Sequence, residues 1–137
     1  MNSLDPMTNK YQRTRQDHSR ETAEDYVELV AELIEKNGEA RAVDLADILG
    51  VSPVTVGKTL QRLDREGYVI TRRYRSIFLT DKGKELARES MNRHELVLAF
   101  LLKIGVPTEI AEIDVEGIEH HVSEETLAAM RRTIERT

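Results

Sequence analysis

The sequence predicts a mainly α-helical protein with one small β-hairpin near its middle. Hydrophobic residues make up 39% of the 137 residues and aromatic residues only 4%, so the core must be aliphatic and most helices amphipathic. Apolar residues recur at helical spacing on both sides of a short segment, residues 68–80, that is rich in β-branched and aromatic residues. This length suits one domain of ordinary size, or two small domains that share a surface.

The first eighteen residues carry no apolar repeat. They are polar, with Pro6 and scattered basic residues, and we expect residues 1–18 to form a mobile N-terminal arm. A helix is predicted from near Ser19 to Lys36. Its apolar residues repeat at helical spacing, and Asn37-Gly38 supplies the stop signal.

The next two predicted helices meet in a tight turn. Gly50 can take the left-handed conformation that ends the first helix, Ser52 can cap the next one, and Pro53 suits its first position. The second helix runs to about Glu66. The apolar residues of the two helices are, in order, Val43, Leu45, Ala46, Leu49, Val56, Leu60 and Leu63. This arrangement is typical of a helix-turn-helix.

A β-hairpin is predicted directly after these helices. Its strands are expected over residues 68–72 and 76–80, with Arg73-Tyr74-Arg75 between them. A helix-turn-helix followed by a hairpin with arginines at its tip describes a winged helix, and we expect residues 19–80 to form this DNA-binding domain. The alternative is an unrelated helical hairpin with a surface β-ribbon.

The remaining residues, 81–137, are expected to be entirely helical. A long helix runs from Thr80, which can cap it, to about Lys103. Pro107 opens a short helix, residues 114–121 form another, and Ser123 caps a last helix that ends near the C-terminus. This half has too little apolar material for an independent core, so we expect it to dimerise.

Charge and composition narrow the class of protein. The net charge is −5, but residues 52–80 hold six basic and two acidic residues, which gives +4 there and leaves −9 elsewhere. A basic middle with acidic flanks suggests two surfaces with different partners.

There is no cysteine, so any metal ligands must be oxygen or nitrogen. No apolar run is long enough to span a membrane and no signal peptide is evident, so we expect a cytoplasmic protein.

The segment Asp-Val-Glu-Gly-Ile-Glu-His-His, residues 114–121, concentrates acids and imidazoles. On a helix, Glu116, Glu119 and His120 share one face, whereas His121 points elsewhere. Such a set suits divalent ions of intermediate hardness, although a solvated acidic face with a paired histidine is the simpler alternative. Asp25 and Glu28, at i and i+3, and His94 are weaker candidates, each ordinary by itself.

Together these features resemble the manganese transport regulator branch of the diphtheria-toxin-repressor family, over about residues 20–135. The resemblance rests on Glu-Asp-Tyr in the first helix, the winged helix, Tyr-Arg-Ser-Ile-Phe-Leu-Thr, Arg-His-Glu-Leu, and Asp-Val-Glu-Gly-Ile-Glu-His-His-Val-Ser. It implies that a pair of metal ions is held by Asp25, Glu28, His94, Glu116, Glu119 and His120. The iron-responsive branch has Met in place of Asp25 and Cys in place of Glu116, and carboxylates there favour Mn(II).

The resemblance implies a Mn(II)-responsive transcriptional repressor of manganese uptake genes that acts as a homodimer on a palindromic operator. About two Mn(II) per chain are expected, with Fe(II), Co(II), Zn(II) or Cd(II) as possible substitutes. No SH3-like third domain, membrane association or small-molecule substrate is expected. The residues expected to contact DNA are Ser52, Pro53, Thr55, Lys58 and Arg62 in the recognition helix and Arg72, Arg73 and Arg75 in the wing.

Three alternatives remain open from the sequence. One is an Fe(II)-responsive regulator of the same fold, and another is a winged-helix dimer whose acidic residues are structural and that needs no metal. The third is a metal-dependent hydrolase, since carboxylates and histidines can hold two ions that activate water. We expect no enzyme, because no separate nucleophile or base is identifiable.

Overall fold

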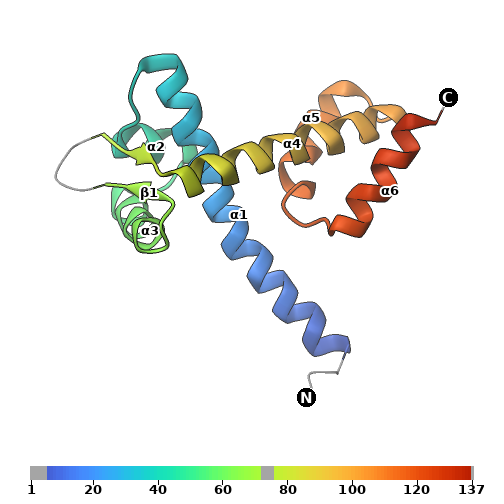
Figure 1. Ribbon diagram of the computed structural model, residues 1–137, viewed down its shortest axis with the longest axis horizontal. Coiled ribbons are helices and arrows are strands. Elements are labelled where there is room, and N and C mark those ends of the chain that lie inside the picture. The colour runs from blue at the N-terminus through green and yellow to red at the C-terminus, as the bar shows by residue number, and fades with distance from the viewer. Residues whose placement is uncertain (1–5, 72–75, 137) are drawn as a thin grey trace. The chain divides into compact units, whose positions relative to one another are not determined.

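The computed structural model describes residues 6–71 and 76–136, and the chain divides into two compact units. One unit comprises Ala23–Glu89, and the other comprises the segments Met1–Thr22 and Ser90–Thr137. The helices α1 (Pro6–Asn37) and α4 (Asp81–Lys103) each contribute to both units (Figure 1). Among the described residues, no helix has the length and apolar character needed to cross a bilayer.

Helix α1 begins earlier than its sequence pattern predicts. It starts at Pro6, so the predicted start near Ser19 is wrong. Residues 9–16 are exposed and make no apolar stripe, which is why periodicity did not reveal them. They are rich in Lys, Arg and Gln, which are good helix formers, and extending an existing helix adds a hydrogen bond for each residue fixed.

The unit Ala23–Glu89 contains a helix-turn-helix. Helices α2 (Ala42–Leu49) and α3 (Pro53–Arg65) are joined as predicted: Gly50 is left-handed with φ 70°, and the Ser52 hydroxyl accepts a hydrogen bond from the Thr55 amide at 3.1 Å. Of the apolar residues of α2, Leu45 and Ala46 are buried, whereas Val43 is 60% exposed. The buried core consists of Ala23, Tyr26, Val30, Leu33, Ala40, Leu45, Ala46, Val56, Leu60, Leu63, Val69 and Ile77.

The hairpin is shorter than predicted. Strands β1 (Val69–Ile70) and β2 (Phe78–Leu79) pair antiparallel, with Val69 opposite Leu79. The pairing stops because the Thr71 amide donates to the Asp64 carboxylate at 3.0 Å, and Ser76 forms a bridge with Arg41 instead. The predicted wing arginines, Arg72, Arg73 and Arg75, lie outside the described residues.

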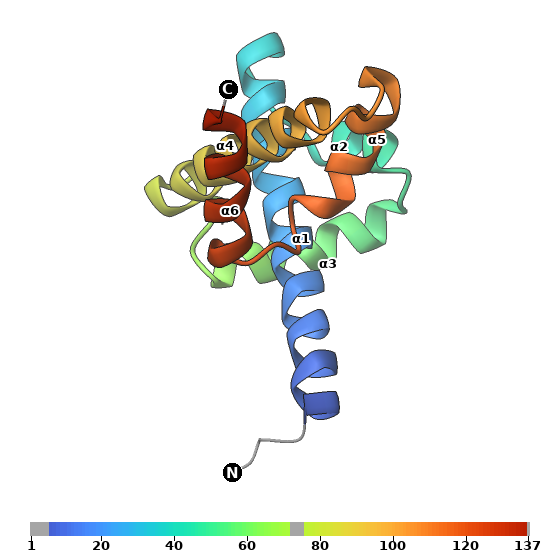
Figure 2. The same cartoon turned by 90° about the vertical axis from the view of Figure 1, so that its right-hand side faces the viewer.

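In the other unit, α5 (Thr108–Ile118) and α6 (Glu124–Glu135) pack beside the C-terminal part of α4 (Figure 2). The prediction that residues 114–121 form a separate helix is wrong, because α5 runs without interruption from Thr108 to Ile118. Ser123 caps α6, accepting from the Thr126 amide at 3.1 Å. The small core consists of Val97, Leu101, Ala111, Val115, Leu127 and Met130.

Candidate metal centre and DNA-binding helix

The end of α5 and the turn after it present two carboxylates and one imidazole. Glu116 lies on the last turn of α5, and Glu119 and His120 follow it. The Glu119 amide donates to the Val115 carbonyl at 3.0 Å, and the His120 amide donates to the Gly117 carbonyl at 3.4 Å. The backbone therefore stays wound past Ile118 and holds the side chains that follow in fixed directions.

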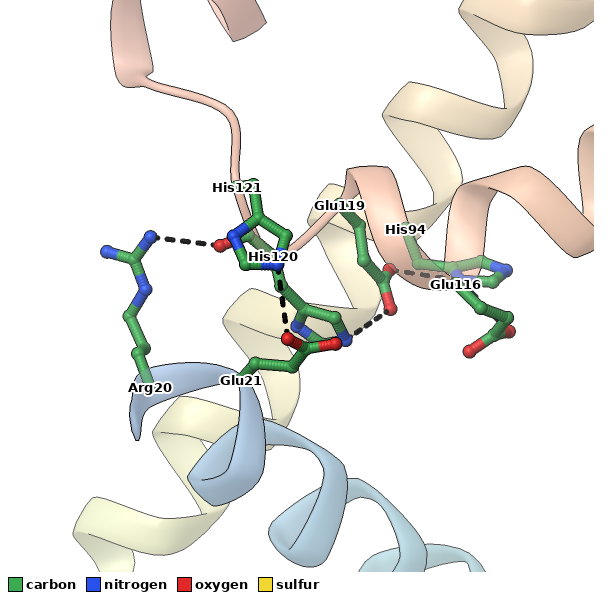
Figure 3. Close-up of polar contacts among 7 residues, drawn as sticks. All are labelled: Arg20, Glu21, His94, Glu116, Glu119, His120 and His121. Atoms are coloured by element: carbon green, nitrogen blue, oxygen red, sulfur yellow. Dashed lines mark hydrogen bonds and ion pairs between the residues drawn. The ribbon is translucent and has the colours of Figure 1, made fainter. Parts of the chain in front are cut away.

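Glu119 lies between two imidazoles (Figure 3). Its Oε2 is 3.0 Å from Nδ1 of His94, and its Oε1 is 3.3 Å from Nε2 of His120. Oε1 of Glu116 is 3.8 Å from the same His94 nitrogen. The side chains of Glu119 and His120 are fully buried, whereas that of Glu116 is 65% exposed. One buried carboxylate thus faces a different ring with each of its oxygens.

The donor atoms of this cluster fit a divalent metal ion. Ligand atoms of His94, Glu116 and Glu119 all lie within 4.8 Å of one another, and none of them is a sulfur. Oxygen and imidazole donors suit divalent first-row ions, and a carboxylate with two oriented oxygens can serve two ions at once. A buried carboxylate is also costly to ionise unless a cation is near, which gives this cluster a reason to bind metal.

Arg20 contacts the cluster and Arg93 lies in its electrostatic field, and sequence reasoning missed both. The Arg20 guanidinium donates to the His120 carbonyl at 3.1 Å and so fixes the backbone of the turn. Burial lowers the pKa of Arg93 from its ordinary value, and the positive charge of Arg20 acts in the same direction, partly opposed by Glu119 and Glu124. No sequence signal could have found Arg20, because it is 100 residues away from its partner.

The six predicted metal ligands fall into two groups. His94, Glu116, Glu119 and His120 come together within the unit that contains α5. Asp25 and Glu28 lie one helical turn apart on the part of α1 that belongs to the unit Ala23–Glu89, and both are partly exposed.

The N-terminal half of α3 presents an exposed polar face. Ser52, Pro53, Thr55 and Lys58 are all exposed, as a recognition helix requires. Arg62 differs, because it is half-buried and its Nε lies 3.7 Å from a carboxylate oxygen of Glu66. Sequence reasoning missed Val54, whose side chain is 66% exposed on this turn. An exposed valine among polar residues has the chemistry to contact a thymine methyl group.

Family models match nearly all of the described chain. The N-terminal DNA binding domain of the iron dependent repressors matches residues 18–77, and their metal binding and dimerisation domain matches residues 80–136. The chain belongs to this family of repressors. The family's fold is a DNA-binding domain followed by a helical dimerisation domain, which confirms the predicted fold class.

Members of the iron dependent repressor family with curated names are similar over most of the chain. The transcriptional regulator MntR of Escherichia coli O6:H1 is 52% identical over 121 residues, which cover 88% of this chain and 78% of the relative. The regulator MntR of Bacillus subtilis is 48% identical over 100 residues, 73% of this chain and 70% of the relative. Both are named transcriptional regulators and not enzymes, so the hydrolase alternative is dropped.

Solved members of the family share the fold at lower identity. A manganese-dependent transcriptional repressor in complex with manganese superposes with a TM-score of 0.72 at 26% identity. The match covers 82% of this chain and 52% of that one. The chain therefore spans about half the length of that solved relative.

Proposed function

We propose that this repressor-family chain is a Mn(II)-responsive DNA-binding transcriptional regulator that represses manganese uptake genes when it is loaded with metal. The observation that carries the proposal is the fully buried Glu119 carboxylate between His94 and His120, in a donor set without sulfur. The solved relative that is named a manganese-dependent repressor, at 26% identity, supports the same metal.

The metal site would comprise all six predicted ligands and hold about two Mn(II) per chain. His94, Glu116, Glu119 and His120 would supply one part of the set, and Asp25 and Glu28 on α1 would complete it. Four of these six groups are carboxylates, which makes the site harder than one with sulfur and suits Mn(II). Fe(II), Co(II), Zn(II) or Cd(II) could still occupy it, because affinity alone does not exclude them.

Metal would control DNA binding through the charge of the site. Four carboxylates in one small volume repel one another unless cations compensate them. Asp25 and Glu28 belong to the unit that contains α3, whereas the other four ligands belong to the unit of α5 and α6. Bound ions would therefore link the two units and fix the separation of the recognition helices in a homodimer. On a palindromic operator those helices must meet major grooves about 34 Å apart.

The dimer would use α3 to read DNA. Ser52, Thr55 and Lys58 are placed to meet base edges, and Pro53 orients the helix start. Arg62 would contribute less, because Glu66 is close to it. The wing residues Arg72, Arg73 and Arg75 would contact phosphates or the minor groove. Action on chromosomal operators implies a cytoplasmic protein.

The proposal is tested by titrating metal-free protein with Mn(II) under anaerobic conditions, with EPR detection and Fe(II) as competitor. We expect about two Mn(II) per chain, magnetically coupled and retained against Fe(II). In parallel, fluorescence anisotropy with a labelled operator should show DNA binding that appears with Mn(II) and disappears with a chelator. Ready displacement by Fe(II) would point to an iron sensor, and DNA binding independent of metal would point to structural acids.

A further inference from the structure

A second group of potential metal ligands lies outside the six proposed manganese ligands. It consists of His18 and Glu21, one turn apart on α1, and His121, which follows the turn after α5. All three belong to the unit of Met1–Thr22 and Ser90–Thr137. One ligand atom from each residue lies within 4.8 Å of the other two.

The three side chains are already oriented toward one another. Nε2 of His121 is 3.1 Å from Oε1 of Glu21, and the rings of His18 and His121 meet edge to face with centroids 5.6 Å apart. Figure 3 shows the His121 ring turned toward Glu21, whereas the neighbouring His120 ring turns toward Glu119. The two adjacent histidines thus have different nearest carboxylates, Glu21 for His121 and Glu119 for His120.

We propose that His18, Glu21 and His121 form a further metal site that prefers Zn(II). Two imidazoles and one carboxylate make it richer in nitrogen than the proposed manganese set, in which four of six donors are carboxylates. Imidazole suits ions at the zinc end of the first-row series, and two histidines with one glutamate is an established zinc ligand set. Three protein ligands leave one tetrahedral position for a ligand from solution.

The surroundings allow such an ion to enter and to gain its fourth ligand. The side chains of His121 and Glu21 are 34% and 29% exposed, so the site is partly shielded but open to solvent. An open groove of about 440 Å³ adjoins it, lined by Lys10, Arg13, Thr14 and the two histidines. Because Lys10 and Arg13 are cationic, the fourth position favours an anion such as hydroxide or a carboxylate over neutral water.

An ion at this site would restrain a functional part of the chain. It would tie the N-terminal part of α1 to the residue that directly follows His120. Arg13 and Arg20 already bind this turn through the carbonyls of His121 and His120, at 3.5 and 3.1 Å. Zn(II) would add a third restraint on the turn that carries two of the proposed manganese ligands.

Equilibrium dialysis of the full chain against Zn(II), with the bound metal quantified, tests the proposal. His18→Ala and Glu21→Gln each remove one donor, and Gln12→Ala removes an exposed polar side chain from the same helix as a matched control. We expect wild type and the control to bind one more Zn(II) per chain than either ligand variant, or both ligand variants to bind that ion on the order of 100-fold more weakly. Equal stoichiometry and affinity in His18→Ala and wild type would overturn the proposal.

A second measurement separates this site from the manganese switch. In the Mn(II) EPR titration, His18→Ala should retain the same number of Mn(II) ions per chain as wild type. If His18→Ala loses both Zn(II) and Mn(II), the cluster is a structural part of the manganese site and the separate zinc site is refuted. If wild type fails to bind Mn(II) at all, the proposed function is refuted, but the dialysis experiment still shows whether His18, Glu21 and His121 bind Zn(II).

Discussion

Replacing Glu119 by glutamine tests whether its buried carboxylate binds metal. The change keeps the volume of the side chain and removes its negative charge, in a residue that is fully buried. Both carboxylate oxygens face imidazoles, at 3.0 and 3.3 Å, so the change removes the negative charge that the two rings share. We expect Glu119→Gln to fold and to lose most of its stabilisation by Mn(II).

The size of the effect follows from the linkage between binding and unfolding. At a free Mn(II) concentration about 100 times the wild-type Kd, binding to one site stabilises the folded state by about 2.7 kcal/mol. Changing groups that only orient metal ligands weakens binding roughly 10- to 100-fold, so losing a direct buried ligand should cost about 100-fold or more. The stabilisation then falls to about 0.4 kcal/mol. With a Tm response of about 2–4 °C per kcal/mol, the Mn(II)-induced shift shrinks by roughly 5–9 °C.

Thermal unfolding with and without Mn(II) measures this difference, and each variant serves as its own metal-free reference. Glu112→Gln is the matched control, because it makes the same chemical change at an exposed position of α5. The control should keep the wild-type shift. A full Mn(II) shift in Glu119→Gln would refute the assignment of Glu119 as a ligand, and so would an equal loss in Glu112→Gln.

The fold and the DNA face give two further predictions. Gly83→Ala should destabilise the chain by roughly 1–3 kcal/mol in chemical denaturation, because its Cβ would lie 2.1 Å from the Tyr68 carbonyl oxygen. Gly57→Ala, also within a helix but with nothing near its Cβ, should be neutral or stabilising by about 0.5–1 kcal/mol; equal losses would contradict the packing. Lys58→Ala should relax discrimination at one base pair by roughly 1–3 kcal/mol in competition binding across operator variants, whereas Lys84→Ala, an equal loss of charge on α4, should not.

The sequence predicted the elements that carry local signals. Gly50, Ser52 and Pro53 define the turn between α2 and α3 through backbone preferences that need no tertiary contact, and the structure has that turn. The same is true of the Ser123 cap. The predicted ends of helices were less accurate where no such signal exists. Helix α1 begins at Pro6 and not near Ser19, because its exposed N-terminal extension carries no apolar stripe.

Contacts between distant segments could not be predicted in this way. The spacing of Glu116, Glu119 and His120 predicted a shared face with His121 turned away, and in the structure Glu119 contacts His120 whereas His121 contacts Glu21. It could not reveal that Glu21 meets His121, because no periodicity relates residues 100 positions apart. The strands were also predicted too long. The Thr71 amide donates to the carboxylate of Asp64 on α3 and not to the opposite strand, and this contact has no signal in the local sequence.

The two serine caps show how one chemical device can meet different functional requirements in the proposed complex. Ser52 and Ser123 make the same pair of bonds, each accepting from the amide three residues on and donating to the threonine hydroxyl there. For helix stability alone, aspartate would serve equally well at both positions.

At residue 123 that substitution is open, because α6 takes no part in the proposed reading of DNA. At residue 52 a carboxylate would meet the phosphate backbone in the proposed complex, and the repulsion would oppose binding at every operator. In the proposed complex, only neutral caps at position 52 would be compatible with DNA binding. The proposed recognition helix would then tolerate fewer residues at its cap than its own folding requires.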